Sequence, residues 1–203
     1  MMYLASKSPQ RKALLEALGV DFEVVPPDYQ EETEAHELPA QIVERHSRGK
    51  AFSVLHKLED LTAKRPVIGV DTMVVFGGRV TGKVEDEEQA AGLLRSMSGN
   101  PHLVYSGITL VWPGSGPGER EEQTAHAVTE VRFSQLSDRE IDAYVACGEW
   151  RGRAGAYAIQ GKASAFVEAI RGDYTNVVGL PVPLLVEMLR LRGSWPPDGW
   201  RSG

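Results

Sequence analysis

The sequence has little cysteine: Cys147 is the only one among 203 residues, which excludes an internal disulfide and a cysteine-based zinc site. It also has no apolar run near the roughly 20 residues that a membrane-spanning helix needs. We expect no signal peptide before the opening residues MMYLAS. These absences predict a protein of a reducing, cytoplasmic compartment with no membrane partner.

Basic residues are also few. Lys and Arg number 22 against 28 Asp and Glu, which gives a net charge of −6. A protein that grips the nucleic-acid backbone over a wide face is usually basic. We therefore expect no nucleic-acid partner, and any anion site must be local, built by a few cations in a cleft.

Several well-known motifs are missing as well. The chain contains no GxxxxGK[ST], HExxH or GxSxG, and the glycines of GSGPG do not have GxGxxG spacing. The five histidines show no metal-ligand spacing: His36, His46, His56, His102 and His126. Any metal would therefore have to be a hard, oxygen-ligated divalent ion such as magnesium or manganese.

Hydrophobic patterning predicts strands and helices without a strict βαβ rhythm, which favours a mixed α/β fold with helices around a mixed sheet. The expected strands cover residues 1–6, 21–27, 66–83 (with a Gly-Gly turn), 102–112, 124–136, 154–161 and 163–174. The expected helices cover residues 8–18, 39–58, 86–97, 137–147 and 181–193, and a loop is expected at 113–123. The length suits one large domain or two small lobes that share a core, and we expect a domain over residues 1–192 followed by a loose tail at 193–203.

The stretch LASKSPQRKALLEALG crowds hydroxyls and cations at the start of the first expected helix. Ser8 is a good N-cap and Pro9 a good first helical residue. A helix N-terminus offers unpaired N–H groups and a partial positive charge, and Arg11 adds a planar fork suited to phosphate oxygens. The stretch indicates an anion site, although a plain capped helix with exposed cations would have the same pattern.

Five polar residues lie in unexpected surroundings. Asp71 is inside the apolar strand VIGVDTMVVF, where an unpaired carboxylate is costly to bury. The others are Lys50 on an apolar helix face, Lys83 after a hairpin, Glu31 in an acidic run, and Gln160 among small residues. Each has a structural alternative, such as a strand-end cap, a lysine whose ammonium reaches water, or a solvated loop. From the residues alone, the functional and structural interpretations both remain open.

Five motifs together resemble the Maf family of nucleotide pyrophosphatases. They are LASKSPQRKALLEALG, VIGVDT, GKVEDEEQAAGLLRSMSGNPH, AGAYAIQG and YTNVVGLPV, in family order from Leu4 to about Leu189. The resemblance implies a long bent mixed sheet flanked by helices around a central cleft, related in shape to inosine triphosphate pyrophosphatases. It also implies metal-dependent cleavage of a nucleoside triphosphate between its α- and β-phosphates, which gives the monophosphate and pyrophosphate.

The family resemblance also assigns functions to the unexpected polar residues. Ser6 and Arg11 match its phosphate-binding opening, and the remaining matches to its active site are Glu31, Lys50, Asp71, Lys83 and Gln160. On this hypothesis, Glu31 and Asp71 hold one or two metal ions, and Asp71 activates water directly or through the metal. Lys50 and Lys83 neutralise developing charge. Thr72 and Gln160 are expected to read the base or ribose.

The sequence departs from the family pattern at three positions. Gln10 replaces the first of the two usual arginines after SP, Arg153 replaces the lysine of KAGAY, and Val84 replaces a proline. Arg153 keeps the charge but changes its geometry, and we expect it to contact substrate. The loss of an arginine at position 10 removes one phosphate-contacting cation.

The substrate class follows from two short sequences. DT after the glycine strand and IQG resemble the branch that acts on dTTP, UTP and related pyrimidine nucleotides, modified forms included, rather than the branch with DQ and SEG that acts on 7-methyl-GTP. Hydrolysis of 7-methyl-GTP or another purine triphosphate is one alternative. A non-catalytic, nucleotide-binding regulator of cell division is the other. A homodimer is common for enzymes of this size, and no stripe in the sequence decides the oligomeric state.

Overall fold

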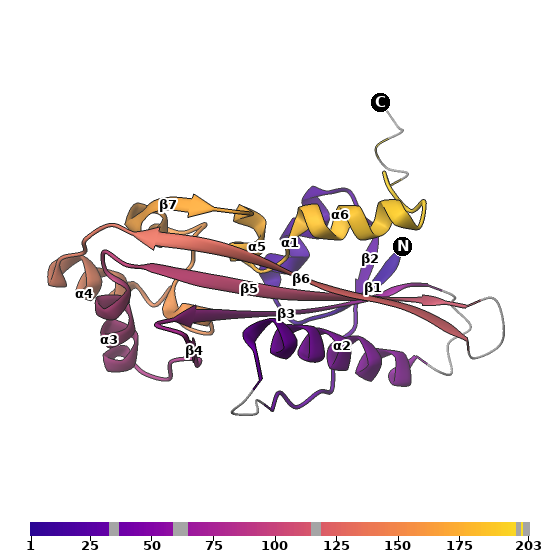
Figure 1. The fold of residues 1–203 in the computed structure, drawn as a ribbon, viewed down its shortest axis with the longest axis horizontal. Coiled ribbons are helices and arrows are strands. Elements are labelled where there is room, and N and C mark those ends of the chain that lie inside the picture. The colour runs from indigo at the N-terminus through magenta and orange to yellow at the C-terminus, as the bar shows by residue number, and fades with distance from the viewer. Residues whose placement is uncertain (33–36, 59–64, 115–118, 198–199, 201–203) are drawn as a thin grey trace.

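A seven-stranded mixed sheet runs along the molecule, in the order β2-β1-β3-β5-β6-β7 with β4 paired to β3 (Figure 1). This computed structural model describes residues 1–32, 37–58, 65–114, 119–197 and 200. The strands are β1 Met2–Ala5, β2 Phe22–Val24, β3 Val67–Phe76, β4 Arg79–Thr81, β5 Pro101–Pro113, β6 Arg120–Phe133 and β7 Val167–Arg171. The helices are α1 Pro9–Ala17, α2 Pro39–Lys57, α3 Glu87–Met97, α4 Asp138–Cys147, α5 Tyr174–Val178 and α6 Val182–Leu191. Strand β1 is parallel to β2 and β3, and the other pairings are antiparallel, which confirms the predicted mixed α/β class.

Helices cover both faces of the sheet, and strand β3 shows why. Its side chains alternate, so Val67 packs with α2 residues while Ile68 and Val70 pack with residues of α1 and α6. Figure 1 shows α2 on one side of β3 and β5, with α1 and α6 on the other. The same alternation sends Asp71 and Thr72 to opposite faces of the sheet.

Two glycines let α2 lie directly on the sheet. A Cβ on Gly69 of β3 would lie 2.1 Å from the Ser47 carbonyl oxygen, and one on Gly107 of β5 would lie 2.2 Å from that of Val43. Neither position can carry a side chain without moving the α2 backbone. Because Gly107 is paired with Asp71 across the ladder, this close approach brings α2 over the carboxylate of Asp71.

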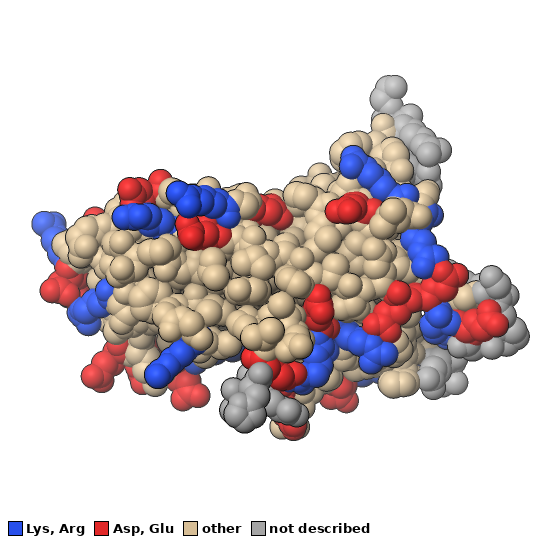
Figure 2. Space-filling view, viewed as in Figure 1, with Lys and Arg blue, Asp and Glu red and all other residues tan. Residues whose placement is uncertain are grey.

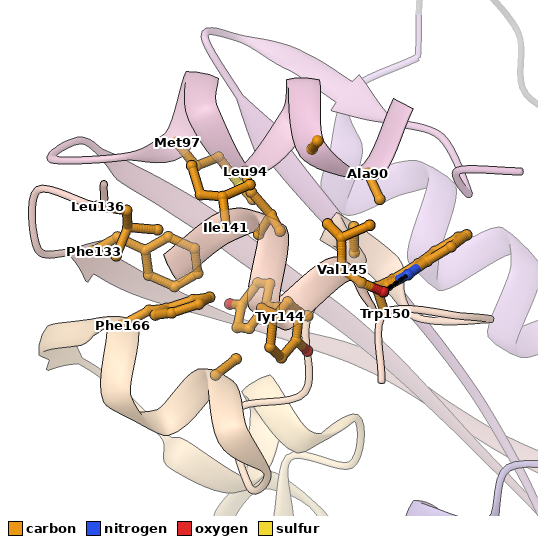
Figure 3. Close-up of a cluster of buried hydrophobic side chains, with 14 of the residues drawn as sticks. Ala90, Leu94, Met97, Phe133, Leu136, Ile141, Tyr144, Val145, Trp150 and Phe166 are labelled. Atoms are coloured by element: carbon orange, nitrogen blue, oxygen red, sulfur yellow. Dashed lines mark hydrogen bonds between the residues drawn. The ribbon is translucent and has the colours of Figure 1, made fainter. Parts of the chain in front are cut away.

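A separate hydrophobic core lies where α3 and α4 meet the far end of the sheet (Figure 3). Both helices start at acceptor side chains: Asp86 caps α3, and Ser137 forms the predicted capping box of α4 with Glu140. The indole of Trp150 donates to the Val145 carbonyl at 2.9 Å. The core includes Ala90, Leu94, Met97, Phe133, Ile141, Tyr144 and Phe166.

The segment between α4 and α6 differs most from the prediction. Residues 154–161 are not a strand: they form the 3-10 turn η1 Ala154–Ala156 and an irregular stretch, because Gly155 and Ala156 have φ of 70° and 59°. A second 3-10 turn, η2 Lys162–Phe166, leaves only Val167–Arg171 as strand β7. Helix α5 was not predicted.

The predicted loop at 113–123 is also wrong in part. Strand β6 begins at Arg120, whose ladder partner is Pro113 of β5, and residues 121–123 continue the pairing. Pairing with β5 thus holds four polar residues, Arg-Glu-Glu-Gln, in a strand conformation although their own β-propensity is low. Residues 115–118 of that loop, and residues 33–36 of the acidic run that contains Glu31, lie outside the described part of the chain.

Two tryptophans of the C-terminal segment contact the rest of the protein. Trp195 packs against the cluster shared by α1 and α6, and Trp200 donates from Nε1 to the Leu18 carbonyl at 2.7 Å. Part of the segment expected to be a loose tail therefore lies against the end of α1.

Charged side chains of both signs are mixed over the face shown in Figure 2. Acidic and basic groups gather toward the two ends of that face and along its edges, with a largely uncharged band between them. Among the residues described, none of the helices has the length and apolar character needed to cross a bilayer.

Candidate active site

A cavity of about 410 Å³ opens where one edge of β3 is left uncovered. Strand β1 ends at Ala5, opposite Gly69, and β4 pairs with β3 only from Val74 onward. Between these pairings, residues 70–73 of β3 have no strand on that edge in the described part of the chain. All nine site residues predicted from the sequence line this cavity: Ser6, Arg11, Glu31, Lys50, Asp71, Thr72, Lys83, Arg153 and Gln160.

Lys50 lies between two carboxylates on one wall of the cavity. Its Nζ is 2.5 Å from Asp71 Oδ1 and 2.7 Å from Glu31 Oε1. The side chains of Lys50 and Asp71 are only 10% and 9% exposed, so this lysine does not extend into water. Lys50 reaches Asp71 from α2, while Glu31 comes from the segment after β2.

Burial opposes the charge on Glu31, but Lys50 outweighs it. Burial acts to raise the pKa of this carboxyl, and the hydrogen bond and charge of Lys50, with the charge of Lys83, bring the pKa below its usual value. Glu31 is therefore ionised at neutral pH. The wall carries two carboxylates around one ammonium, an arrangement that leaves carboxylate oxygens available for further chemistry.

Three protein acceptors hold the guanidinium of Arg11. Nε donates to the Gly179 carbonyl at 2.8 Å, Nη1 to Ser6 Oγ at 3.1 Å, and Nη2 to Thr72 Oγ1 at 3.0 Å. A guanidinium has five N–H groups, so two remain for a ligand. Burial lowers the pKa of Arg11, and the charges of Asp71 and Glu31 act against this, but an arginine stays protonated at any physiological pH.

The Thr72 hydroxyl is engaged within the protein. Besides accepting from Arg11, Thr72 Oγ1 lies 2.9 Å from Ser106 Oγ and 3.3 Å from the Gly179 carbonyl oxygen. Ser106 in turn donates to the Asn176 carbonyl at 3.3 Å. These contacts orient Arg11 and leave the hydroxyl little capacity to read a base, which was the function expected from the sequence.

Sequence reasoning missed Asn176, although YTNVVGLPV contains it. Its side chain is fully buried, and Nδ2 donates to the Val104 carbonyl at 3.0 Å and to Thr129 Oγ1 at 2.9 Å. Asn176 thus fixes α5 on β5 and β6, and α5 leads directly to Gly179, which anchors Arg11. An asparagine in an apolar motif was the signal that could have identified it.

Three predicted residues have side chains without a hydrogen bond or ion pair in the described part of the chain: Lys83, Arg153 and Gln160. Lys83 follows β4, and the other two come from the segment around η1. With Lys7, Arg11 and Lys50, the cavity has five cationic side chains against the two carboxylates. The cleft is therefore locally positive although the protein as a whole is acidic. This is the local anion site that the negative net charge led us to expect.

Tyr157 lines the cavity, and the sequence did not single it out. Its hydroxyl lies 2.8 Å from Nε2 of the buried His102, and both rings pack edge to face with Phe133. Burial lowers the pKa of His102 to about 4, so the imidazole is neutral at pH 7. Burial raises the pKa of Tyr157. The pair is uncharged and fixes one wall of the cavity.

The chain was compared with solved structures. A nucleoside-triphosphatase described as a dITP/XTP pyrophosphatase, from Mycobacterium abscessus, is 17% identical, with 66% of this chain and 73% of that chain covered. Its TM-score of 0.34 is too low to support a conclusion about fold or function.

Sequence comparisons are decisive about the family. A family described as Maf-like protein matches residues 1–192. A dTTP/UTP pyrophosphatase of Pelotomaculum thermopropionicum is 45% identical over 94% of this chain and 95% of its own length. A protein of the same name from Agrobacterium fabrum is 42% identical over 100% and 97%, and one from Moorella thermoacetica is 42% identical over 95% and 95%. The resemblance carried by the five motifs is confirmed: this chain belongs to the Maf-like protein family.

Proposed function

We propose that the protein is a cytoplasmic nucleoside triphosphate pyrophosphatase that converts dTTP and UTP to the monophosphate and pyrophosphate. The observation that carries this proposal is the locally positive cavity with the buried Asp71 on its wall. The proteins that match nearly the whole chain at 42–45% identity have this activity in their names. A cleft for binding alone would have no use for a carboxylate buried beside a lysine.

Positive charge from several directions would bind the triphosphate. Arg11 offers two N–H groups from a fixed position, and the N-terminal end of α1 lies beside it at the cavity wall. Within the described residues, neither Lys83 nor Arg153 has an ion pair or hydrogen bond that substrate binding would break. Fixed cations of this kind stabilise the charge that develops on the bridging and leaving oxygens during hydrolysis.

Asp71 is suited to activate the attacking water. Lys50 binds Oδ1, and no hydrogen bond from a described residue engages Oδ2. Oδ2 would accept a proton from the water as its oxygen attacks the phosphorus, the phosphoanhydride bond breaks, and pyrophosphate leaves. Lys50 holds the carboxylate in place rather than acting as a free cation, which alters the function expected for it from the sequence.

The donor set fits a divalent metal ion. Asp71 and Glu31 present hard carboxylate oxygens on either side of a single Nζ, and magnesium in phosphate-handling sites is commonly bound by one or two carboxylates with substrate phosphates. No group of three His, Cys, Asp or Glu side chains forms a metal cluster in the described residues, so the phosphates would complete the ligation. When bound, the metal would neutralise phosphate charge and polarise its oxygens.

The test is pyrophosphate release by the purified protein with magnesium or manganese, across dTTP, UTP, CTP, 7-methyl-GTP, GTP, ATP and ITP. We expect selective turnover of dTTP and UTP, abolished by EDTA and restored by the metal. Turnover of 7-methyl-GTP alone would support the proposed pyrophosphatase reaction in the cavity but overturn the assignment of dTTP and UTP as substrates. Absence of turnover with every nucleotide would favour a binding regulator and point to the missing arginine at position 10.

A substitution at Thr72 distinguishes the orientation of Arg11 from base reading. Thr72→Val keeps the shape but removes the acceptor for Arg11 Nη2, so we expect kcat/KM to fall about tenfold or more for every pyrimidine triphosphate. Thr72→Ser keeps the acceptor and should stay near the wild type. If Thr72→Val instead changes the ratio of kcat/KM between dTTP and CTP, Thr72 reads the base.

A further inference from the structure

Helix α2 has a glycine in its interior, and an aromatic ring occupies the space above it. A Cβ on Gly49 would lie 2.1 Å from Cε2 and 2.5 Å from Cζ of Tyr29. Glycine inside a helix costs about 0.5–1 kcal/mol relative to alanine. Here the glycine makes the hollow in which the Tyr29 ring lies, so its presence has a packing reason.

His46 holds the other end of the same ring. The Tyr29 hydroxyl lies 3.1 Å from His46 Nδ1, and the two rings meet edge to face with centroids 5.6 Å apart. His46 precedes Gly49 by three residues and Lys50 by four, so all three lie on one face of α2. Tyr29 is therefore fixed on the turn of helix that carries Lys50.

Glu31 follows Tyr29 by two residues and meets Lys50 at 2.7 Å. Hydrogen bonds to the backbone hold other positions of the segment: the Asp28 N–H donates to Ser53 Oγ at 3.2 Å, and Lys57 donates to the Pro26 carbonyl at 2.9 Å. Arg45 donates to the Glu32 carbonyl at 2.7 Å. The Tyr29 ring thus lies in the hollow over Gly49, next to Lys50 in the α2 sequence.

We propose that Tyr29, seated on Gly49 and hydrogen-bonded to His46, is a positioning residue that fixes Glu31 against Lys50 and Asp71. This inference rests on the proposed function for the importance of Glu31, but the seating itself is independent of it. Tyr29 also lines the cavity, so a displaced ring would change the site directly.

The experiment is a double-mutant cycle of Gly49→Ala and Tyr29→Ala, with kcat, KM, thermal unfolding and hydrogen–deuterium exchange of the ligand-free protein as readouts. Gly49→Ala should lower kcat/KM about tenfold to a hundredfold, because the displaced segment misplaces Glu31. Exchange should become faster in residues 26–32. In the Tyr29→Ala background, adding Gly49→Ala should change kcat/KM by less than about twofold, because no ring remains to clash.

The chain offers a matched control in Gly92 of α3. A Cβ on Gly92 would meet nothing within 4 Å, so Gly92→Ala makes the same chemical change inside a helix without a clash. It should leave activity and the exchange of residues 26–32 unchanged. Tyr29→Phe, which keeps the ring and loses the hydroxyl, should retain more activity than Tyr29→Ala.

Wild-type activity and exchange of residues 26–32 in Gly49→Ala would overturn the proposal. So would a loss of activity from Gly49→Ala that is just as large without the Tyr29 ring. If the wild type hydrolyses no nucleotide, the proposed function fails, but hydrogen–deuterium exchange still tests whether the Tyr29 ring on Gly49 holds the segment in place. Faster exchange of residues 26–32 in Gly49→Ala supports this, and unchanged exchange overturns it.

Discussion

Replacing Asp71 with asparagine is expected to lower kcat for pyrophosphate release from dTTP by about 10²- to 10⁴-fold, the usual contribution of a positioned general base. Asparagine keeps the size of the side chain but cannot accept the proton of the attacking water. It also removes one of the two carboxylates that would hold the metal. The measurement is kcat at saturating nucleotide and metal.

The control for this variant is its fold and its affinity for nucleotide. Lys50 keeps Glu31 as a counter-ion in Asp71→Asn, and the asparagine amide oxygen still accepts from Nζ, so the variant should unfold cooperatively. Binding of UMP should change by only a few-fold, since Arg11, Lys83 and Arg153 are untouched. A kcat within tenfold of the wild type would show that Asp71 is not the base.

Asp71 and Lys50 could be singled out from the sequence because each violates a local rule, and the family resemblance then gave them and the other site residues their functions. Asp71 in an apolar strand and Lys50 on an apolar helix face are costly alone, and the structure shows that they offset this cost by pairing with each other. The sequence does not show that they meet. That depends on the close approach of α2 to Gly69 and Gly107, which is a property of packing between elements far apart in the chain.

Other features depend on tertiary contacts that leave no local pattern. Residues 154–161 read as a strand because they are apolar and small, but Ala156 has a positive φ, and the Ala158 N–H donates to the Tyr144 hydroxyl instead of to a strand. The DT sequence of the pyrimidine branch suggests that Thr72 reads the base or ribose. It does not show that strand alternation turns the hydroxyl away from Asp71 and toward Arg11.

Lys83→Met is expected to lower kcat/KM about 10²- to 10³-fold, comparable to the loss of one preorganised donor to transition-state charge. Lys83 lines the cavity, and in the described residues its ammonium has no ion pair or hydrogen bond to lose. Its removal should therefore leave the urea midpoint of unfolding unchanged. A kcat/KM within tenfold of the wild type would remove Lys83 from the phosphate site.

Lys50→Met removes the same charge, yet the consequence should be different. It leaves Asp71, 9% exposed, buried without its counter-ion and facing Glu31, so the free energy of unfolding should fall by about 3–5 kcal/mol. Urea unfolding of the two variants side by side measures this contrast. Equal midpoints would mean that the stability of the fold with Asp71 buried does not depend on Lys50. A lower midpoint for Lys50→Met alone separates the two lysines: one maintains the carboxylate wall, and the other is available to the phosphates.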